Sequence, residues 1–146
     1  MYTHILIPTD GSELAQKGID HALSLAKVLG SKVTIVTATE PFPIIYGREW
    51  QPGPVEMARF EKENSDAAAE ALSKVQAAAE RSGVQAVTRH VPNQRAATAI
   101  IETSEREGCN LIVMSSHGRT GIVRAFLGSQ TMDVITHSKI PVLVVR

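Results

Sequence analysis

The chain has 146 residues, enough for one domain with a core of its own. Lys plus Arg and Asp plus Glu number 15 each, and the resulting zero net charge argues against a nucleic-acid-binding protein. No apolar run approaches the roughly 18 residues of a membrane span. Cys109 is the only cysteine, which excludes an intrachain disulfide and favours a reducing compartment. The N-terminus also lacks the pattern of a signal peptide, so we expect a cytoplasmic protein.

Strand-like and helix-like segments alternate through the first third of the chain. Ile5–Ile7 and Val33–Val36 are short apolar runs rich in β-branched residues, typical of buried parallel strands. Between them Ser12 is a plausible N-cap, and Gly30 ends a helical pattern. That pattern places one set of residues inward: Ala15, Gly18, Ile19, Ala22, Ala26 and Leu29. Residues 40–54, with four prolines and two glycines, predict a mobile flap over a ligand.

The same alternation continues to the end of the chain. Val55–Ser82 predicts an Ala-rich helix whose apolar stripe consists of Ala68, Leu72, Val75 and Ala79. Val84–Val91 mixes polar and apolar residues, which suggests a strand at a sheet edge. A further helix ends at Gly108, and the buried strand Leu111–Met114 follows. The last elements are a short helix after Ser129, with Met132 and Ile135 inward, and the strand Val142–Val145.

Strict alternation of strands and helices predicts an α/β fold. We expect a five-stranded parallel sheet covered on both faces by helices, a three-layer α/β/α arrangement within one domain. In such a sheet ligands bind at the carboxyl ends of the strands, where the strand order reverses. Two strand ends carry suitable chemistry: residues 8–12 (Pro-Thr-Asp-Gly-Ser) and residues 115–118 (Ser-Ser-His-Gly). If the first and fourth strands are neighbours, both loops open into one crevice. Residues 37–39, at the end of the second strand, would line the far side of this crevice.

The stretch from Leu111 to Ser129 has the pattern of a phosphate-binding loop. A buried strand breaks into small polar residues, glycine recurs at Gly118, Gly121 and Gly128, and Ser129 opens a short helix. Backbone N–H groups and the partial positive charge of a helix N-terminus can together hold an anion. The sequence therefore predicts an anionic ligand.

These residues resemble the universal stress protein family. The resemblance lies in residues 5–12 (Ile-Leu-Ile-Pro-Thr-Asp-Gly-Ser), in residues 113–129 and in the ending His-Ser-Lys-Ile-Pro-Val-Leu-Val-Val, and it covers the whole chain. It implies a Rossmann-like, adenine nucleotide alpha hydrolase-like fold with strand order 3-2-1-4-5, and one family domain over residues 1–146. The ATP-binding branch carries Gly-x2-Gly-x9-Gly-Ser/Thr. Gly118, Gly128 and Ser129 match this motif, whereas Ser115 replaces its first glycine.

The resemblance further implies a ligand and the residues that bind it. The ligand would be ATP, or another adenine nucleotide such as AMP, with Mg²⁺ bound through the phosphates. The binding residues would be Pro8, Thr9, Asp10 and Ala38 around the adenosine, Met114 and Ser115 near the ribose, His117, Gly118 and Arg119 along the phosphates, and Gly128, Ser129 and Gln130 holding them. No residue is assigned to catalysis or to direct metal ligation.

Several alternatives remain open at this stage. Asp10 could equally be a turn residue with no contact to a ligand. Ser129 could serve only as the N-cap of the helix that follows it.

The leading hypothesis is a nucleotide-binding regulatory protein of the stress response, and the alternative is a nucleotide-free dimeric interaction module. Ser115 argues for the module, whereas the match at Gly118, Gly128 and Ser129 argues against it. Slow ATP hydrolysis is a third possibility, although the chain lacks the Gly-x4-Gly-Lys-Ser/Thr motif. The apolar strand Val142–Val145 at a sheet edge favours a homodimer in which it pairs with the same strand of a second chain. The family's dimers are built in this way. The alternative is that a helix of the same chain covers the strand.

Overall fold

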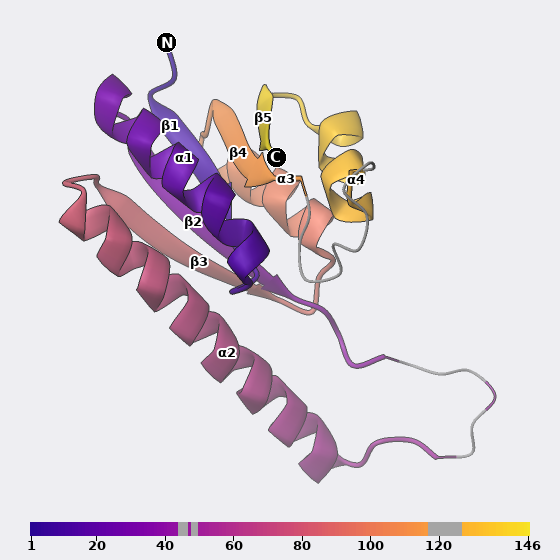
Figure 1. Cartoon of the computed structure of the whole chain (residues 1–146). Helices are drawn as coiled ribbons and strands as arrows, with labels where there is room; N and C mark the ends of the chain where they lie inside the picture. Colours follow the sequence, from indigo (N-terminus) through magenta and orange to yellow (C-terminus); the bar gives the residue numbers. More distant parts are fainter. Residues whose placement is uncertain (44–46, 48–49, 117–126) are drawn as a thin grey trace.

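The computed structural model describes residues 1–43, 47, 50–116 and 127–146. Strands and helices alternate from end to end in the order expected from the sequence (Figure 1). The strands are β1 His4–Pro8, β2 Lys32–Thr39, β3 Ala86–Pro92, β4 Leu111–Ser115 and β5 Val142–Val145. The helices are α1 Glu13–Leu29, α2 Pro54–Arg81, α3 Ala96–Arg106 and α4 Ser129–His137.

The five strands form one parallel sheet in the order β3-β2-β1-β4-β5, which confirms the expected fold and strand order. β1 lies between β2 and β4, with Pro8 opposite Val36 and Leu6 opposite Ile112. The strand order therefore reverses at β1, and the carboxyl ends of β1 and β4 lie side by side. β3 and β5 form the two edges, so the mixed composition of β3 indicated its position correctly.

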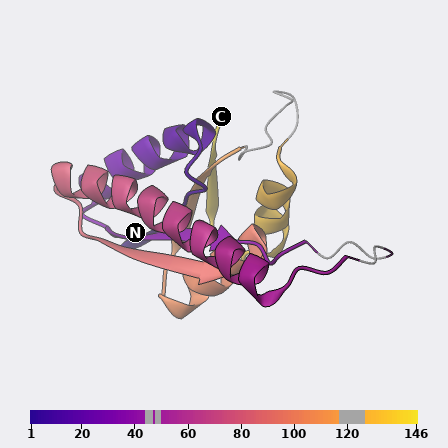
Figure 2. The ribbon, with the colours of Figure 1, turned by 90° about the horizontal axis from the view of Figure 1, so that it is seen from below.

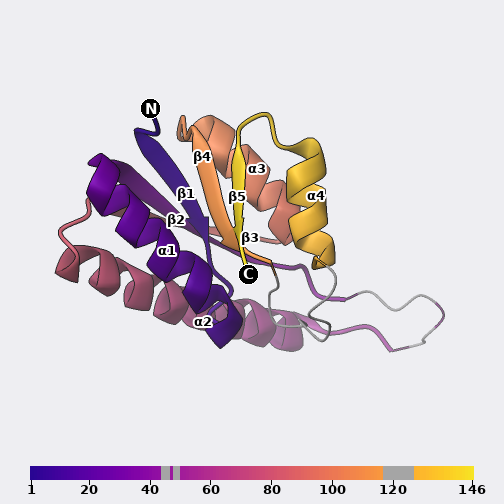
Figure 3. The same cartoon turned by 45° about the horizontal axis from the view of Figure 1, so that its top comes forward.

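Two apolar layers sandwich the sheet because side chains alternate between its faces. Ile5 and Ile7 pack under α1 and α2, whereas Leu6 of the same strand packs under α3 and α4. Figure 3 shows these two helix pairs on opposite sides of the strands. Among the described helices, none combines the length and the apolar character that a membrane crossing requires.

α1 and α2 bury nearly the faces that their sequences predict. Ser12 caps α1, its Oγ accepting a hydrogen bond from the Ala15 N–H at 3.3 Å, and Gly30 ends the helix. The predicted stripe of α2 is buried in full: Ala68, Leu72, Val75 and Ala79. Leu29 was predicted inward but is 43% exposed, because it is the last residue of α1 and lies beyond the core, where Leu23 packs instead.

The inward face of α4 differs from the prediction. Met132 and Ile135 are exposed, and Thr131 and Val134 are buried in their place. The Thr131 hydroxyl donates to the Ser116 carbonyl at 3.1 Å, which turns this face of the helix toward the end of β4. Apolar periodicity alone missed a helix whose orientation depends on a buried threonine.

The N-terminal half of α2 extends beyond the carboxyl ends of the strands (Figures 1 and 2). Its C-terminal half packs on the sheet through Leu72, Val75 and Ala79. One helix therefore contributes to the core at one end and stands next to the ligand-binding edge of the sheet at the other.

Cys109 is buried, 6% exposed, at the start of the loop that leads into β4. Burial raises the pKa of its thiol to about 11, so the thiol is protonated at neutral pH. A protonated buried thiol is a poor nucleophile, which agrees with the inert cysteine expected from the sequence.

The stability of the fold should fall in mild acid because of buried His4. Its Nε2 atom lies 2.8 Å from Thr34 Oγ1; burial and nearby Lys32 lower its pKa, although Glu107 opposes this shift. The unfolded chain takes up a proton near pH 6.5 and the folded chain does so only at lower pH. The free energy of unfolding should therefore decrease below about pH 6.5, by at most about 1.4 kcal/mol per pH unit for this group.

Denaturant unfolding at a series of pH values checks this expectation. The variant His4→Gln should show a flatter decline than the wild-type protein, with a residual slope from His90, whose pKa burial also lowers. The matched control is His21→Gln, on the exposed face of α1. Equal slopes in both variants would contradict a role for His4.

Candidate functional site

A cavity of about 580 Å³ lies at the carboxyl ends of β1, β2 and β4. The loop after β1 and the end of β4 both open into it, as expected for neighbouring strands at the point where the strand order reverses. All four helices also contribute to its wall. Because α2 and α4 lie on opposite faces of the sheet, the cavity crosses the edge of the sheet from one face to the other (Figure 1).

The sequence-predicted site residues that the structure describes all line this one cavity. They are Pro8, Thr9, Asp10, Ala38, Met114, Ser115, Gly128, Ser129 and Gln130. The three others, His117, Gly118 and Arg119, lie outside the described residues. The structure thus brings the predicted set together, and the role of each residue in binding stays a prediction.

Hydrogen bonds within the β1–α1 turn fix the position of Asp10. Its Oδ1 atom accepts hydrogen bonds from the Ser12 N–H, at 2.9 Å, and from the Ser12 hydroxyl. Thr9 is buried beside it, and its N–H donates to the Val36 carbonyl at 2.9 Å. Asp10 therefore has the turn role considered above, and the same bonds hold its carboxylate on the cavity wall.

The start of α4 is held directly against the end of β4. The Gly128 N–H donates to the Ser116 carbonyl at 2.9 Å, and Thr131 bonds the same carbonyl. Gly128 is the N-cap and Ser129 the first helical residue, so Ser129 is not the N-cap. The N-cap residue Gly128 makes no side-chain cap hydrogen bond, and the first N–H groups of a helix have no partner within it. The positive end of α4 is therefore available on the cavity wall.

Gln130 links α4 to the neighbouring helix. Its Oε1 atom accepts a hydrogen bond from the Ala97 N–H at 2.9 Å, which caps α3, since the N-cap residue Arg95 makes no side-chain cap hydrogen bond. An ion pair between Arg95 and Asp133, at 2.8 Å, joins the same two helices. This use of the Gln130 side chain was not predicted, since residues so far apart in sequence leave no local pattern.

Sequence reasoning missed the two helical walls of the cavity. α2 contributes Phe60, Asn64, Ala67, Ala68 and Ala71, and α3 contributes Ala96, Ala99 and Ile100. One signal was present in the sequence, because Asn64 interrupts an otherwise apolar helical stripe. From the predicted flap, Glu40, Pro41 and Pro43 also line the cavity, whereas residues 44–46 and 48–49 lie outside the described part of the chain. The mobility predicted for this flap stays untested.

The described lining combines apolar groups with few charges. Asp10 and Glu40 are its acidic residues, and no lysine or arginine is among the described residues that line it. Alanine side chains and Phe60 supply flat apolar surface, and the N-terminus of α4 supplies N–H donors. This arrangement suits a ligand with an apolar ring at one end and an anionic group at the other.

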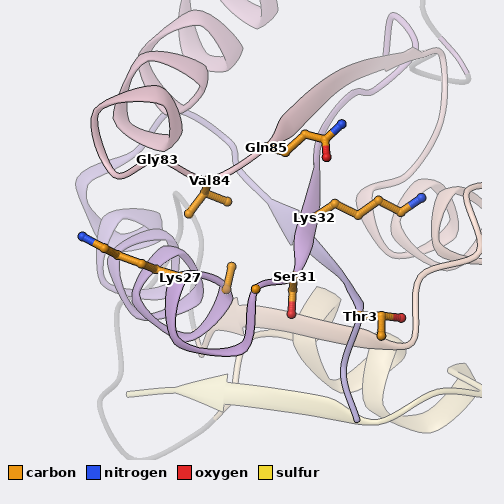
Figure 4. A pocket seen from close by; sticks show the side chains of 9 residues that line it. Thr3, Lys27, Ser31, Lys32, Gly83, Val84 and Gln85 are labelled. Carbon is orange, nitrogen blue, oxygen red and sulfur yellow. The ribbon is translucent and has the colours of Figure 1, made fainter.

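A second hollow, of about 380 Å³, lies at the opposite end of the sheet. Thr3, Ser31 and Gln85 border it, and Lys27 and Lys32 point in opposite directions (Figure 4). Its charged groups do not converge on one point, so it is a weaker candidate than the cavity at the carboxyl edge.

Known proteins with similar sequences and structures share this architecture. Universal stress protein MJ0531 of Methanocaldococcus jannaschii is 34% identical over 146 residues, which cover all of this chain and 83% of that protein. The solved structure of protein MJ0577, from the same organism, has a TM-score of 0.84 at 28% identity and matches 99% of this chain and 96% of that chain.

Two further solved structures were determined with ligands. One is a universal stress protein in complex with cAMP, with a TM-score of 0.71, 23% identity, and coverage of 99% of this chain and 97% of that chain. The other is the universal stress protein of Archaeoglobus fulgidus in complex with dAMP, with a TM-score of 0.66, 19% identity and coverage of 99% and 98%. At these identities the likeness is one of fold.

The family assignment rests on the sequence match together with the fold. The family model described as "Universal stress protein family" matches residues 1–146. The sheet order and the position of the cavity agree with what the resemblance in the sequence implied. The chain therefore belongs to the universal stress protein family.

Proposed function

We propose that this protein binds an adenine nucleotide, with ATP as the first candidate, and acts as a cytoplasmic regulatory module in a stress response. The observation that carries the proposal is the convergence of the predicted residues that the structure describes on one cavity at the N-terminus of α4. The phosphates would accept hydrogen bonds from N–H groups of Ser129 and Gln130, and the adenosine would lie along Asp10 and Ala38. Relatives of the same fold that bind cAMP or dAMP support an adenine ligand.

Mg²⁺ would reach this site on the phosphates. In the described ranges no group of three or more His, Cys, Asp or Glu side chains is placed to hold a metal ion. Magnesium commonly binds proteins through phosphates and water with few protein ligands, which fits such a site. His117, Gly118 and Arg119 would lie along the phosphates, as the family resemblance implies, and Arg119 would add positive charge there.

Isothermal titration calorimetry of ATP with Mg²⁺ tests the proposal. We expect saturable heat at one nucleotide per chain below about 1 mM ATP. The variant Ser115→Gly should bind ATP several-fold more tightly, because removal of the side chain lets the ligand approach the end of β4 more closely. No heat for either protein would contradict nucleotide binding and favour the nucleotide-free interaction module. Weaker binding by Ser115→Gly would show instead that the serine contacts the ligand.

Binding without appreciable hydrolysis is the expected behaviour. Hydrolysis needs a general base that activates water, and the Asp10 carboxylate already accepts two hydrogen bonds from Ser12. A steady-state phosphate-release assay separates the two activities. Steady release above the rate without protein would favour the slow hydrolase.

A homodimer through β5 is part of the proposal. β5 is an edge strand, and Leu143 on it and Met132 and Ile135 on α4 are exposed apolar side chains. An apolar edge strand is commonly covered by the same strand of a second chain across a two-fold axis. Sedimentation equilibrium should return the mass of two chains, and a mass of 15.7 kDa at all concentrations would contradict it.

A further inference from the structure

Asn64 occupies a position in α2 where the pattern of the helix calls for an apolar residue. Ala68, Leu72, Val75 and Ala79 follow one another at intervals of three or four residues along one face, and Phe60 lies eight residues before Ala68. Asn64 lies four residues after Phe60 and four before Ala68, so it belongs to this face. It is the polar residue in a stripe that is otherwise apolar.

The structure provides no folding role for this amide. Asn64 is partly buried on the cavity wall, and within the described residues its side chain makes no hydrogen bond. Asparagine also favours caps and turns over the interior of a helix, where its amide competes for backbone groups. An amide retained at such a position, and facing a cavity, is available to a ligand.

The cavity fixes which end of a nucleotide would meet Asn64. α4 and α2 lie on opposite faces of the sheet, and both line the same cavity (Figure 1). A nucleotide whose phosphates lie at the N-terminus of α4 must extend across the sheet edge toward α2. Phe60, one helical turn from Asn64, packs edge-to-face on Phe42 with ring centroids 4.9 Å apart. The base would therefore meet an aromatic wall with one amide on it.

We propose that Asn64 recognises the base and selects adenine through its exocyclic amine, an inference that rests on the nucleotide-binding function proposed above. Oδ1 accepts a hydrogen bond from the N6 amine, and Nδ2 donates one to the adjacent ring nitrogen. An amide presents an acceptor and a donor side by side, which complements this edge of adenine. The small side chains of Ala67 and Ala71, on the same helix, leave space for the adenine ring.

A pair of ligands that differ only in the amine tests this proposal. The probes are ATP and purine riboside triphosphate, which has hydrogen at position 6, titrated calorimetrically with Mg²⁺. The wild-type protein should bind ATP about 10-fold more tightly than the analogue. The variant Asn64→Leu should bind both ligands with affinities within about two-fold of each other, mainly because its affinity for ATP falls.

Two controls separate recognition from a structural effect. Leucine suits both the helix and its apolar stripe, so Asn64→Leu should keep or raise the melting temperature. The variant Glu63→Leu changes the neighbouring exposed residue, which does not line the cavity, and should keep the 10-fold preference.

The outcomes distinguish this inference from the function on which it rests. A preference for ATP that Asn64→Leu abolishes supports the proposal. If the wild-type protein and Asn64→Leu show the same preference for ATP over the analogue, Asn64 does not recognise the amine. The same conclusion follows if the variant's affinities for ATP and for the analogue fall by the same factor. In both cases nucleotide binding itself stands. If the wild-type protein binds neither nucleotide, both proposals fail.

Discussion

Replacing Ser129 with glutamate should stabilise the protein and at the same time weaken its binding of ATP. Ser129 is exposed in the first turn of α4, and the N-cap residue Gly128 makes no side-chain cap hydrogen bond. A carboxylate there interacts favourably with the positive helix end, by about 0.3–1 kcal/mol, which should raise the melting temperature by about 1–3 °C. The same carboxylate would face the phosphates of the nucleotide. We expect the affinity for ATP to fall by about 30-fold or more, ~2 kcal/mol.

The opposite signs of these two effects make the experiment specific. A damaged fold would lower both the melting temperature and the affinity, so it cannot imitate the expected result. Adenosine, which has no phosphates, should bind the variant within about two-fold of its affinity for the wild-type protein. Ser129→Ala, which removes the hydroxyl without adding charge, is the matched control and should lose only a few-fold. Unchanged ATP affinity in Ser129→Glu would place the phosphates elsewhere.

Replacing Gly18 with valine should destabilise the fold by about 3 kcal/mol. Gly18 is buried in α1, and a Cβ atom there would lie 2.7 Å from the backbone N of Ser115 and 3.1 Å from the carbonyl carbon of Met114. Both neighbours are main-chain atoms of β4, so a flexible side chain cannot relieve the clash. α1 would have to move away from the sheet, and the packing of the core layer that α1 shares with Leu111 and Val113 of β4 would suffer.

Urea denaturation measures this loss, and ATP titration measures its effect on the site. Met114 and Ser115 line the cavity, so displacement of β4 should also reduce ATP affinity in the fraction that stays folded. Lys17→Val introduces the same side chain at the adjacent, exposed position of α1 and should change stability by less than about 1 kcal/mol. Equal stability of Gly18→Val and Lys17→Val would show that the helix and strand have room to separate.

Local patterns in the sequence were sufficient to predict the fold class and the order of elements along the chain. Short runs such as Ile5–Ile7 and Leu111–Met114 have no polar alternation, which identified strands covered on both faces. Helical crossovers between parallel strands then left few possible topologies. The order of the strands came from the family resemblance, and the pairing of β1 with both β2 and β4 confirms it.

The site was predictable where it depends on strand ends or on the glycine motif that precedes α4. Asp10 and Ser115 follow directly from the position of ligands in parallel sheets, whereas Met114 and the role of Ala38 beside the adenosine came from the family resemblance. The contribution of α2 depends on how far that helix extends beyond the sheet, and the cap from Gln130 to Ala97 depends on how two helices approach each other. Similarly, the inward face of α4 was predicted wrongly because a hydrogen bond from Thr131 outweighs the apolar pattern of Met132 and Ile135.

The division of α2 along its length has an evolutionary consequence. Substitutions at Leu72, Val75 or Ala79 would disturb the interior, so selection for folding constrains that end of the helix. Substitutions at Phe60 or Asn64 change the wall of the cavity without touching that interior. Duplicated copies of such a gene can therefore diverge in ligand preference through one half of a single helix while inheriting an unaltered scaffold from the other.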